Sequence, residues 1–430
     1  MKKKYLNRFY KKPLNKKLEA LRKAEVISTE DYEALKNKAL KLPTDIANQM
    51  IENYIMNYEL PFGIAMNFVI DEKEILIPMV TEEPSVIAAA SNSGKIIGRS
   101  GGFQTEMKER SMIAQVALKD VSNIDTAIKN IQESEEQIIE LANAAHPSIL
   151  NYGGGAQRID TRFIPADEKF GTPEFLVIHL IVNTGEAMGA NIVNTMAEAI
   201  APFVANLADG SNLMNILSNY ATESVAIAKC AIDPRYLSTK TMDGETVRDQ
   251  IIEATQFALV DPYRAVTHNK GIMNGIDAVL LATGNDWRAV EAGAHAYATR
   301  NGQYRSLSRW AKDADGNLVG ELELPISVGS VGGTLSIHPG AQFAYSLLDQ
   351  PNANGLSRIL VAVGLAQNLS AVRALVTEGI QKGHMGLQAR SLAIRVGATG
   401  ENIERVAKRL QEAKHMNSQT AKQILDEISK

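Results

Sequence analysis

Cysteine is almost absent from this chain of 430 residues, which contains only Cys230. One thiol excludes a disulfide within the chain and a cysteine-rich zinc or iron–sulfur site. The seven histidines are scattered and never form an H-E-x-x-H pair. We therefore expect metal-free chemistry and a reducing, cytoplasmic location.

An excess of positive charge is missing as well, because 45 Lys and Arg stand against 49 Asp and Glu, a net charge of -4. Nucleic acid is therefore not an expected partner. The charge is unevenly placed, since residues 1–17 contain eight basic residues and no acid, which leaves -12 on the other 413 residues. This basic arm is interpreted either as a solvated tail or as a contact for phosphate.

Long hydrophobic runs are also lacking. The apolar stretch 175–182 is far shorter than the ~20 residues that span a membrane, and no apolar run of a secretory signal follows the basic arm. We expect a soluble protein that is not exported by that route.

Two nucleotide-binding motifs are absent. The triplet Gly153-Gly154-Gly155 is followed by Ala156, Gln157 and Arg158, which does not fit G-x-G-x-x-G, and no G-x-x-x-x-G-K-[ST] occurs. An ordinary Rossmann dehydrogenase or a P-loop enzyme is therefore not expected.

The apolar residues, 45% of the chain, suffice for a large core and more than one domain. Their spacing predicts helices over 14–60, a hairpin over 65–80 and a helix that Pro84 opens. Residues 111–232 predict the order β-α-β-β-α-β of a split, ferredoxin-like sandwich. The expected fold is α+β, with a mostly helical large domain and an inserted small domain. The strands of this order are expected at 112–118, 158–164, 175–182 and 225–232, and its helices at 124–145 and 187–207. The expected domain segments are 1–110 and 221–378 for the large domain, 111–220 for the small domain and 379–430 for a helical C-terminal segment.

Two acids stand in polar clusters beside predicted helices. Glu83 precedes Pro84, which favours an extended backbone and places the carboxylate near a helix N-terminus. Asp286 occupies a position typical of a helix N-cap. Capping alone is the alternative explanation for each acid.

A lysine and a histidine complete the set. Lys270 is expected in a turn and partly desolvated between glycine and apolar residues, where it would stabilise an oxyanion, with snorkelling as the alternative. His384 is expected in a turn, isolated between glycines after a long apolar helix, where a structural role is the alternative. Together the four side chains suit proton movement while a carbonyl becomes an alkoxide. The residues alone thus indicate a metal-free carbonyl reductase or a binding protein.

Around these clusters the chain resembles the soluble bacterial class II reductases of 3-hydroxy-3-methylglutaryl-coenzyme A (HMG-CoA), in the correct order from about Pro43 onward. The resemblance implies a two-step, four-electron reduction of HMG-CoA to mevalonate and CoA that consumes two reduced nicotinamide cofactors. It also implies that the large domain binds HMG-CoA, that the small, non-Rossmann domain binds NAD(P), and that the C-terminal segment is a mobile flap. The matching strings are Glu52-Asn53, Glu82-Glu83-Pro84-Ser85, Ala187 to Asn191, Asp261 to Asp277, Gly284 to Glu291 and Lys382 to Met385.

The resemblance assigns a role to each catalytic side chain. Lys270 would stabilise the alkoxide, and Glu83 would donate a proton in the mevaldehyde step. His384 would protonate the departing CoA thiolate, and Asp286 would tune Lys270 and Glu83. Arg264 would bind the HMG carboxylate. Its implied polar neighbours are Ser85, Asn219, Asn274 and Gln367.

For the cofactor the resemblance points to the start of the helix over 187–207, where backbone N–H groups face a pyrophosphate. Glu186 stands where the family has Asp. His146 stands where an NADH-using relative has an aspartate that binds the ribose 2′-hydroxyl. Without that aspartate no negative charge repels a 2′-phosphate, so NADPH is expected, with NADH as the second candidate. The implied cofactor residues are His146, Glu186, Ala187, Met188, Gly189 and Asn191.

The resemblance also implies a homodimer with shared active sites, or a larger oligomer built from it, and CoA phosphates as a partner for the basic arm near Lys11. Two other functions stay open. One is the reverse reaction, an NAD-dependent oxidation of mevalonate, and the other is a CoA-binding protein without turnover.

Overall fold

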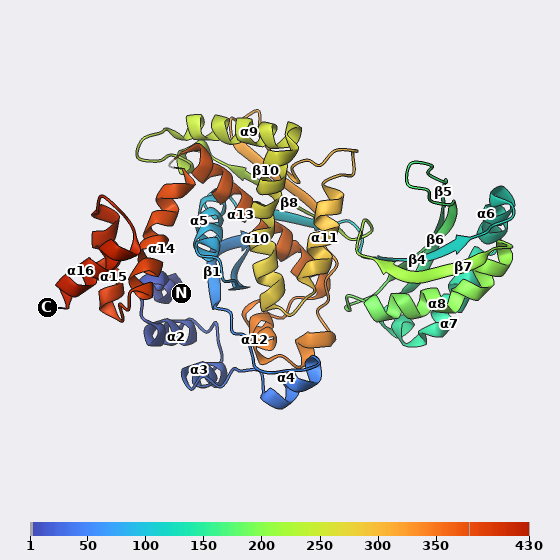
Figure 1. The fold of residues 1–430 in the computed structure, drawn as a ribbon, viewed down its shortest axis with the longest axis horizontal. Coiled ribbons are helices and arrows are strands. Elements are labelled where there is room, and N and C mark those ends of the chain that lie inside the picture. Colours follow the sequence, from blue (N-terminus) through green and yellow to red (C-terminus); the bar gives the residue numbers. More distant parts are fainter. Residues whose placement is uncertain (1–2, 378, 430) are drawn as a thin grey trace.

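The computed structural model describes residues 3–377 and 379–429. In Figure 1 a small sheet with its helices lies at one end, a mixed body of helices and strands in the middle, and three C-terminal helices at the opposite end. This arrangement agrees with the expected mixture of helices and strands.

The N-terminal segment forms short helices, as predicted, up to Met50 rather than residue 60. Ser28 caps the third of them, because its Oγ accepts a hydrogen bond from the amide of Asp31 at 2.9 Å. The carboxylate of Asp31 accepts from the Ser28 amide in return, a complete capping box. These helices are α1 (Lys3–Leu6), α2 (Leu14–Lys23), α3 (Thr29–Lys36) and α4 (Thr44–Met50), with the 3-10 turn η1 (Phe9–Lys11).

The predicted hairpin is present as the antiparallel pair β1 (Phe62–Ile70) and β2 (Lys73–Val80). The next helix, α5, covers Val86–Gly98. The prediction that Pro84 is its first residue is wrong, because Ser85 adopts a left-handed φ of 79° and the helix begins only after it.

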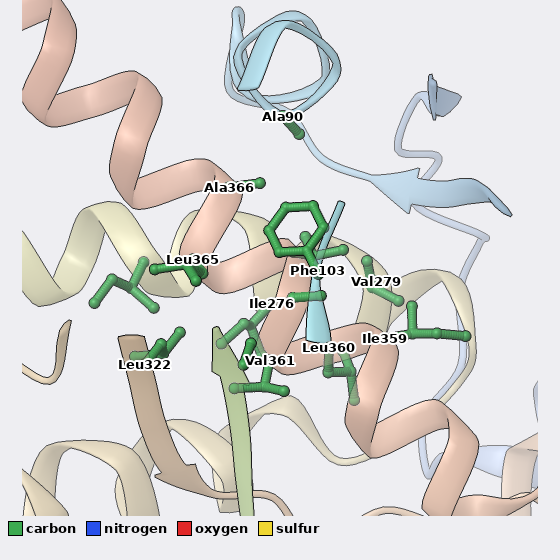
Figure 2. Close-up of a cluster of buried hydrophobic side chains, with 14 of the residues drawn as sticks. Ala90, Phe103, Ile276, Val279, Leu322, Ile359, Leu360, Val361, Leu365 and Ala366 are labelled. Atoms are coloured by element: carbon green, nitrogen blue, oxygen red, sulfur yellow. The ribbon is translucent and has the colours of Figure 1, made fainter. Parts of the chain in front are cut away.

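The core of the large body consists of a four-stranded sheet and the helices packed on it, in the strand order β3-β8-β10-β9. Helix α13 runs through this core, and Figure 2 shows its residues Leu360, Val361 and Leu365 beside Ile276 of α10 and Leu322 of β10. The strands are β3 (Gln104–Met107), β8 (Val225–Ile232), β9 (Ser308–Lys312) and β10 (Leu318–Pro325). The helices are α9 (Gly244–Val260), α10 (Pro262–Ala282), α11 (Trp287–Tyr297), α12 (Pro339–Leu347) and α13 (Ala353–Val376), with the 3-10 turns η3 (Pro234–Tyr236) and η4 (Gly333–Ser336).

Helix α13 is the one described helix long and apolar enough to cross a membrane, which the sequence reading overlooked. Most of its apolar window, 67%, is buried inside the protein. This burial is typical of a central core helix.

The small sheet has the antiparallel order β5-β6-β4-β7, which is that of a split β-α-β-β-α-β sandwich. Two sequence predictions fail here. The single helix over 124–145 is broken at Ser134 into two helices. The last strand is residues 211–218, whereas 225–232 is β8 of the large sheet. The elements are β4 (Met112–Lys119), α6 (Ile124–Glu133), α7 (Glu135–Ala145), η2 (Pro147–Tyr152), β5 (Gly155–Ile164), β6 (Phe175–Asn183), α8 (Ala190–Leu207) and β7 (Ser211–Ser218).

The two strands differ in burial, which explains the error. β8 lies between β3 and β10 and is apolar except for Lys229, with few exposed positions. β7 is an edge strand whose Leu213, Met214 and Ile216 are exposed among polar residues, so it lacks a clear strand pattern.

The C-terminal segment contains α14 (Ile380–Arg395), α15 (Glu401–Glu412) and α16 (Ser418–Ile428), which bury a small apolar cluster of their own. The backbone of His384 belongs to α14 rather than to the expected turn. Its side chain lies outside the described part of the structure.

Candidate active site

Two of the expected catalytic side chains meet directly. The Nζ of Lys270 on α10 donates a hydrogen bond to Oε2 of Glu83 at 2.7 Å. Glu83 follows the end of β2, and its amide donates to Oγ1 of Thr81 at 3.1 Å. Its carboxylate therefore pairs with a lysine from a distant helix and does not cap α5.

The position of Lys270 differs from the prediction in two respects. α10 begins at Pro262, capped by the Asp261 carboxylate that accepts from the Arg264 amide at 2.8 Å. Lys270 therefore lies in the third turn of a helix. Its side chain is 57% exposed in this single chain, so the expected desolvation is not reached there.

Lys270, Asn274 and Asp277 share one face of α10, because they follow the i, i+4, i+7 spacing. Gln367 on α13 faces the same helix, since a Cβ on Gly275 would lie 3.0 Å from the Gln367 Cβ. Gln367 is 5% exposed. Of the expected substrate residues, Asn274 thus lies one turn from Lys270 on α10, and Gln367 packs against the neighbouring Gly275.

Asp277 is a residue of this face that the sequence reading missed. Burial, reinforced by the negative charge of Glu291, raises the pKa of Asp277 to about 8. Its buried Oδ1 has no hydrogen-bond partner among the described residues. The seven-residue spacing from Lys270 within one motif was the signal that could have identified it.

Asp286 caps α11, as the alternative explanation of this acid predicted. Its Oδ1 accepts from the Ala289 amide at 3.1 Å and lies 3.8 Å from the Arg288 guanidinium. Within the described residues no hydrogen bond joins Asp286 to Lys270 or Glu83. Its tuning role therefore stays a prediction.

The other expected substrate residues lie on three different elements. Ser85 precedes α5, next to Glu83, and Asn219 is exposed just after β7. Arg264 is half-buried in the first turn of α10, and burial lowers its pKa. Among the described side chains none forms an ion pair with Arg264, so its guanidinium is available for an external carboxylate.

A buried hydrogen-bond network, also missed from the sequence, lies beside these residues. The Nε2 of His268 lies 2.7 Å from Ser308 Oγ and 2.8 Å from Asn368 Nδ2. The Asn368 Oδ1 accepts from the Trp310 indole at 2.7 Å. Burial, with the charge of Arg264, lowers the pKa of His268 to about 3, so its ring is neutral. The network fixes α10 against β9 and α13.

A groove of about 1990 Å³ extends from Glu83 toward the N-terminal arm. Glu83 and Ser85 line it together with Arg8, Tyr10 and Arg358. The space is large enough for an extended ligand that reaches the arm from Glu83.

The start of α8 is shaped for close approach of an anionic group. Gly189, the N-cap, has φ 94°, and a Cβ there would lie 2.2 Å from Thr184 Cγ2. The first turn contains no acid, and its leading N–H groups have no partner within the helix. These features fit the pyrophosphate of a dinucleotide.

The remaining residues expected to bind the cofactor lie at the same end of the small sheet. Gly155 pairs with Asn183 in the strand register, which brings the loop of His146 next to the segment 184–189. His146 is half-buried, and its Nδ1 lies 3.3 Å from Ser148 Oγ. Glu186, in contrast, directs its carboxylate to the large domain, where it accepts from the Ala353 amide at 2.7 Å.

Comparisons with known proteins identify the family. A family model described as hydroxymethylglutaryl-coenzyme A reductase matches residues 13–389. The chain belongs to this family. The resemblance seen in the motifs is confirmed, and with it the function of an HMG-CoA reductase, an oxidoreductase.

Individual relatives agree with this assignment. The 3-hydroxy-3-methylglutaryl-coenzyme A reductase of Archaeoglobus fulgidus is 43% identical over 420 residues, 98% of this chain and 94% of the relative. A probable HMG-CoA reductase of Borreliella burgdorferi is 34% identical over 81% of this chain and 78% of its own length.

Solved reductase structures also match over nearly the whole chain. An HMG-CoA reductase from Streptococcus pneumoniae superposes with a TM-score of 0.84 at 45% identity, covering 98% of this chain and 99% of that one. The class II reductase of the same organism, bound to NADPH in open conformations, gives a TM-score of 0.83 at 44% identity over 97% and 100% of the two chains.

Within the described residues, no group of three or more His, Cys, Asp or Glu side chains is arranged to hold a metal ion.

Proposed function

We propose that Lys270 and Glu83 are the catalytic pair of this HMG-CoA reductase, acting on the carbonyl carbon of the thioester and then of the aldehyde. The observation that supports this proposal is the 2.7 Å hydrogen bond between the Lys270 ammonium and the Glu83 carboxylate, which places a cationic donor beside a carboxyl group. When bound, the reduced nicotinamide supplies hydride. Lys270 stabilises the oxyanion at each reduction, and Glu83 delivers the proton that completes the alcohol.

His384 and Asp286 are proposed for the other two roles. His384 protonates the CoA thiolate after the flap 379–430 closes over the substrate. Asp286, at the start of α11, tunes Lys270 and Glu83 once substrate is bound.

Arg264 is proposed to hold the HMG carboxylate, because a guanidinium binds a carboxylate through two parallel hydrogen bonds. The position of Asn274 one turn from Lys270, and the packing of Gln367 against Gly275 beside Asn274, support their contact with the same ligand. Ser85 and Asn219 are proposed to complete its polar surroundings. CoA would extend along the groove toward the basic arm, where Arg8 and Tyr10 line the wall.

NADPH is the proposed hydride donor, held by the small domain 111–220. A class II relative is bound to NADPH, and in this chain Ala187, Met188, Gly189 and Asn191 lie at the shaped start of α8. His146 places no negative charge against a 2′-phosphate. A purified enzyme with a higher kcat/KM for NADH than for NADPH would contradict this preference.

We also propose a cytoplasmic homodimer that completes each active site. The 57% exposure of Lys270 in one chain supports a partner that covers it. Sedimentation should give at least twice the mass of one chain, and a fully active monomer would contradict the shared site.

A spectrophotometric assay tests the function itself. We expect HMG-CoA to oxidise two NADPH for each mevalonate formed and one CoA thiol released. Efficient turnover only from mevalonate with NAD would indicate the reverse, catabolic direction. A protein that binds HMG-CoA without any turnover would contradict the catalytic assignment.

A further inference from the structure

Glu186 uses its polar groups to bind the large domain. Its carboxylate accepts hydrogen bonds from the hydroxyl of Ser330 and, at 2.7 Å, from the amide of Ala353. Its carbonyl oxygen accepts from the Ser330 amide at 2.8 Å. The residue that begins the cofactor loop therefore fastens this loop to another domain.

The surroundings favour a charged carboxylate at this position. Ala353 is the first residue of α13, a helix of 24 residues, and its N-terminus attracts an anion. Burial raises the pKa of Glu186, but the hydrogen bonds from Ser330 and Ala353 and the charge of Arg110 outweigh it, so the pKa lies below its usual value.

The backbones of the two domains touch beside Glu186. Arg110 donates to the carbonyl oxygens of Ala187 at 2.9 Å and Val328 at 2.6 Å, and so joins the two loops. A Cβ on Gly329 would lie only 2.7 Å from the amide nitrogen of Met188. Only glycine allows this approach.

Gly329 is in turn held by the neighbour of a catalytic residue. Its amide donates to Oδ1 of Asn285 at 2.9 Å, and its carbonyl accepts from Tyr345 Oη at 2.7 Å. Asn285 directly precedes Asp286. Burial, opposed by the hydrogen bond from Asn285 and reinforced by the charge of Glu186, raises the pKa of Tyr345 to about 12, so its hydroxyl stays a donor.

We propose that these contacts form a clasp that fixes the cofactor loop 187–189 relative to the turn that carries Asp286. In this clasp Glu186, Asn285 and Tyr345 are positioning residues, and Glu186 does not bind the cofactor itself. The proposal rests on the proposed cofactor site at the start of α8. The clasp consists of Arg110, Glu186, Asn285, Gly329, Ser330 and Tyr345.

The first test is Glu186→Gln, which keeps the size of the side chain and removes its charge. The Kd of NADPH, measured by fluorescence titration without HMG-CoA, should rise about tenfold, because hydrogen bonds to a charged group are lost. The KM for HMG-CoA should change less than twofold. Glu198→Gln, at an exposed position on α8, is the matched control and should leave both constants unchanged.

Hydrogen exchange of the cofactor-free protein supplies a readout independent of turnover. Amides of residues 185–191 should exchange faster in Glu186→Gln than in the wild type or in Glu198→Gln. Wild-type exchange together with a wild-type Kd would overturn the clasp. An inactive wild-type enzyme would instead contradict the proposed function, so the two failures are distinguishable.

A double-mutant cycle tests the connection to the Asp286 turn. Tyr345→Phe removes the donor to the Gly329 carbonyl and should also raise the NADPH Kd. If both side chains serve one clasp, the NADPH Kd of the double variant should rise by less than the product of the two single fold-increases. A fold-increase in Kd equal to the product of the two single increases would show two independent contacts and would overturn the proposed connection.

Discussion

The Glu83–Lys270 pair and the clasp around Gly329 are both polar, but they are built in opposite ways. The pair joins two side chains that are 38% and 57% exposed, whereas the clasp uses backbone groups held by the half-buried Asn285 and the buried Tyr345. An exposed pair contributes little to folding and is free to change partners when a ligand arrives. A satisfied contact between buried backbone groups fixes a distance. The difference fits the two proposed roles, chemistry at the pair and positioning at the clasp.

The largest effect should come from removing the ammonium group at the pair. Lys270→Met should lower kcat by about 10²- to 10³-fold, the usual loss for an oxyanion donor. Its thermal midpoint should stay near that of the wild type, because the ion pair is exposed. Steady-state kinetics and calorimetry measure the two quantities, with Lys129→Met on α6 as a control. A large loss of stability with a near-normal kcat would reverse the contrast between the regions.

The next effect should come from the clasp itself. Gly329→Ala would place a methyl group 2.7 Å from the Met188 amide nitrogen, so the two loops must separate. We expect the KM for NADPH to rise about tenfold, with a smaller change in the KM for HMG-CoA. Gly332→Ala is a useful comparison, because a Cβ there meets no atom within 4 Å, although its positive φ adds strain of its own. Equal changes in both Michaelis constants for Gly329→Ala would argue against a role limited to the cofactor loop.

The two regions also differ in how far the sequence could reveal them. Glu83 and Lys270 stand in short strings with distinctive neighbours, and the resemblance assigned both to one set of catalytic side chains. The clasp joins positions 110, 186, 285, 329, 330 and 345, and no local pattern connects them. For Glu186 the resemblance predicts a cofactor contact, but local sequence does not show that its carboxylate points to Ser330 and Ala353.

The fold shows the same limit. The β1–β2 hairpin and the core strand β8 have strong local patterns, and the sequence reading found both segments. Their placement was less certain, because a buried apolar run such as β8 fits any sheet, and it was assigned to the wrong one. The edge strand β7 and the break at Ser134 depend on packing between distant segments, which local spacing does not encode.

Asp277 lies on the Lys270 face of α10 but is only half-exposed, and one of its carboxylate oxygens is buried, so its titration sharpens the comparison. Its pKa is raised to about 8, and the folded protein therefore retains a proton that the unfolded chain releases near pH 4. The contribution of this group to the free energy of unfolding must therefore fall as the pH rises from about 4 to about 8. Relative to Asp277→Asn, the wild type should lose free energy of unfolding by at most about 1.4 kcal/mol per pH unit over this window. Urea unfolding of both proteins between pH 5 and 8 measures the difference. Parallel curves would mean that Asp277 ionises normally.

The smallest effect is expected at the basic arm, which lies at the far end of the groove from Glu83. If residues of the arm contact the CoA phosphates, Lys11→Ala and Lys12→Ala should each raise the KM for HMG-CoA by about two- to fivefold at low salt, with kcat unchanged. The increase should shrink at high ionic strength, because the contact is exposed and screened, and Lys36→Ala on α3 should show no such change. A KM that is unchanged at low salt in the Lys11→Ala, Lys12→Ala double variant would leave the arm as a solvated tail. The groove would then bind its ligand through residues nearer to Glu83, such as Arg358.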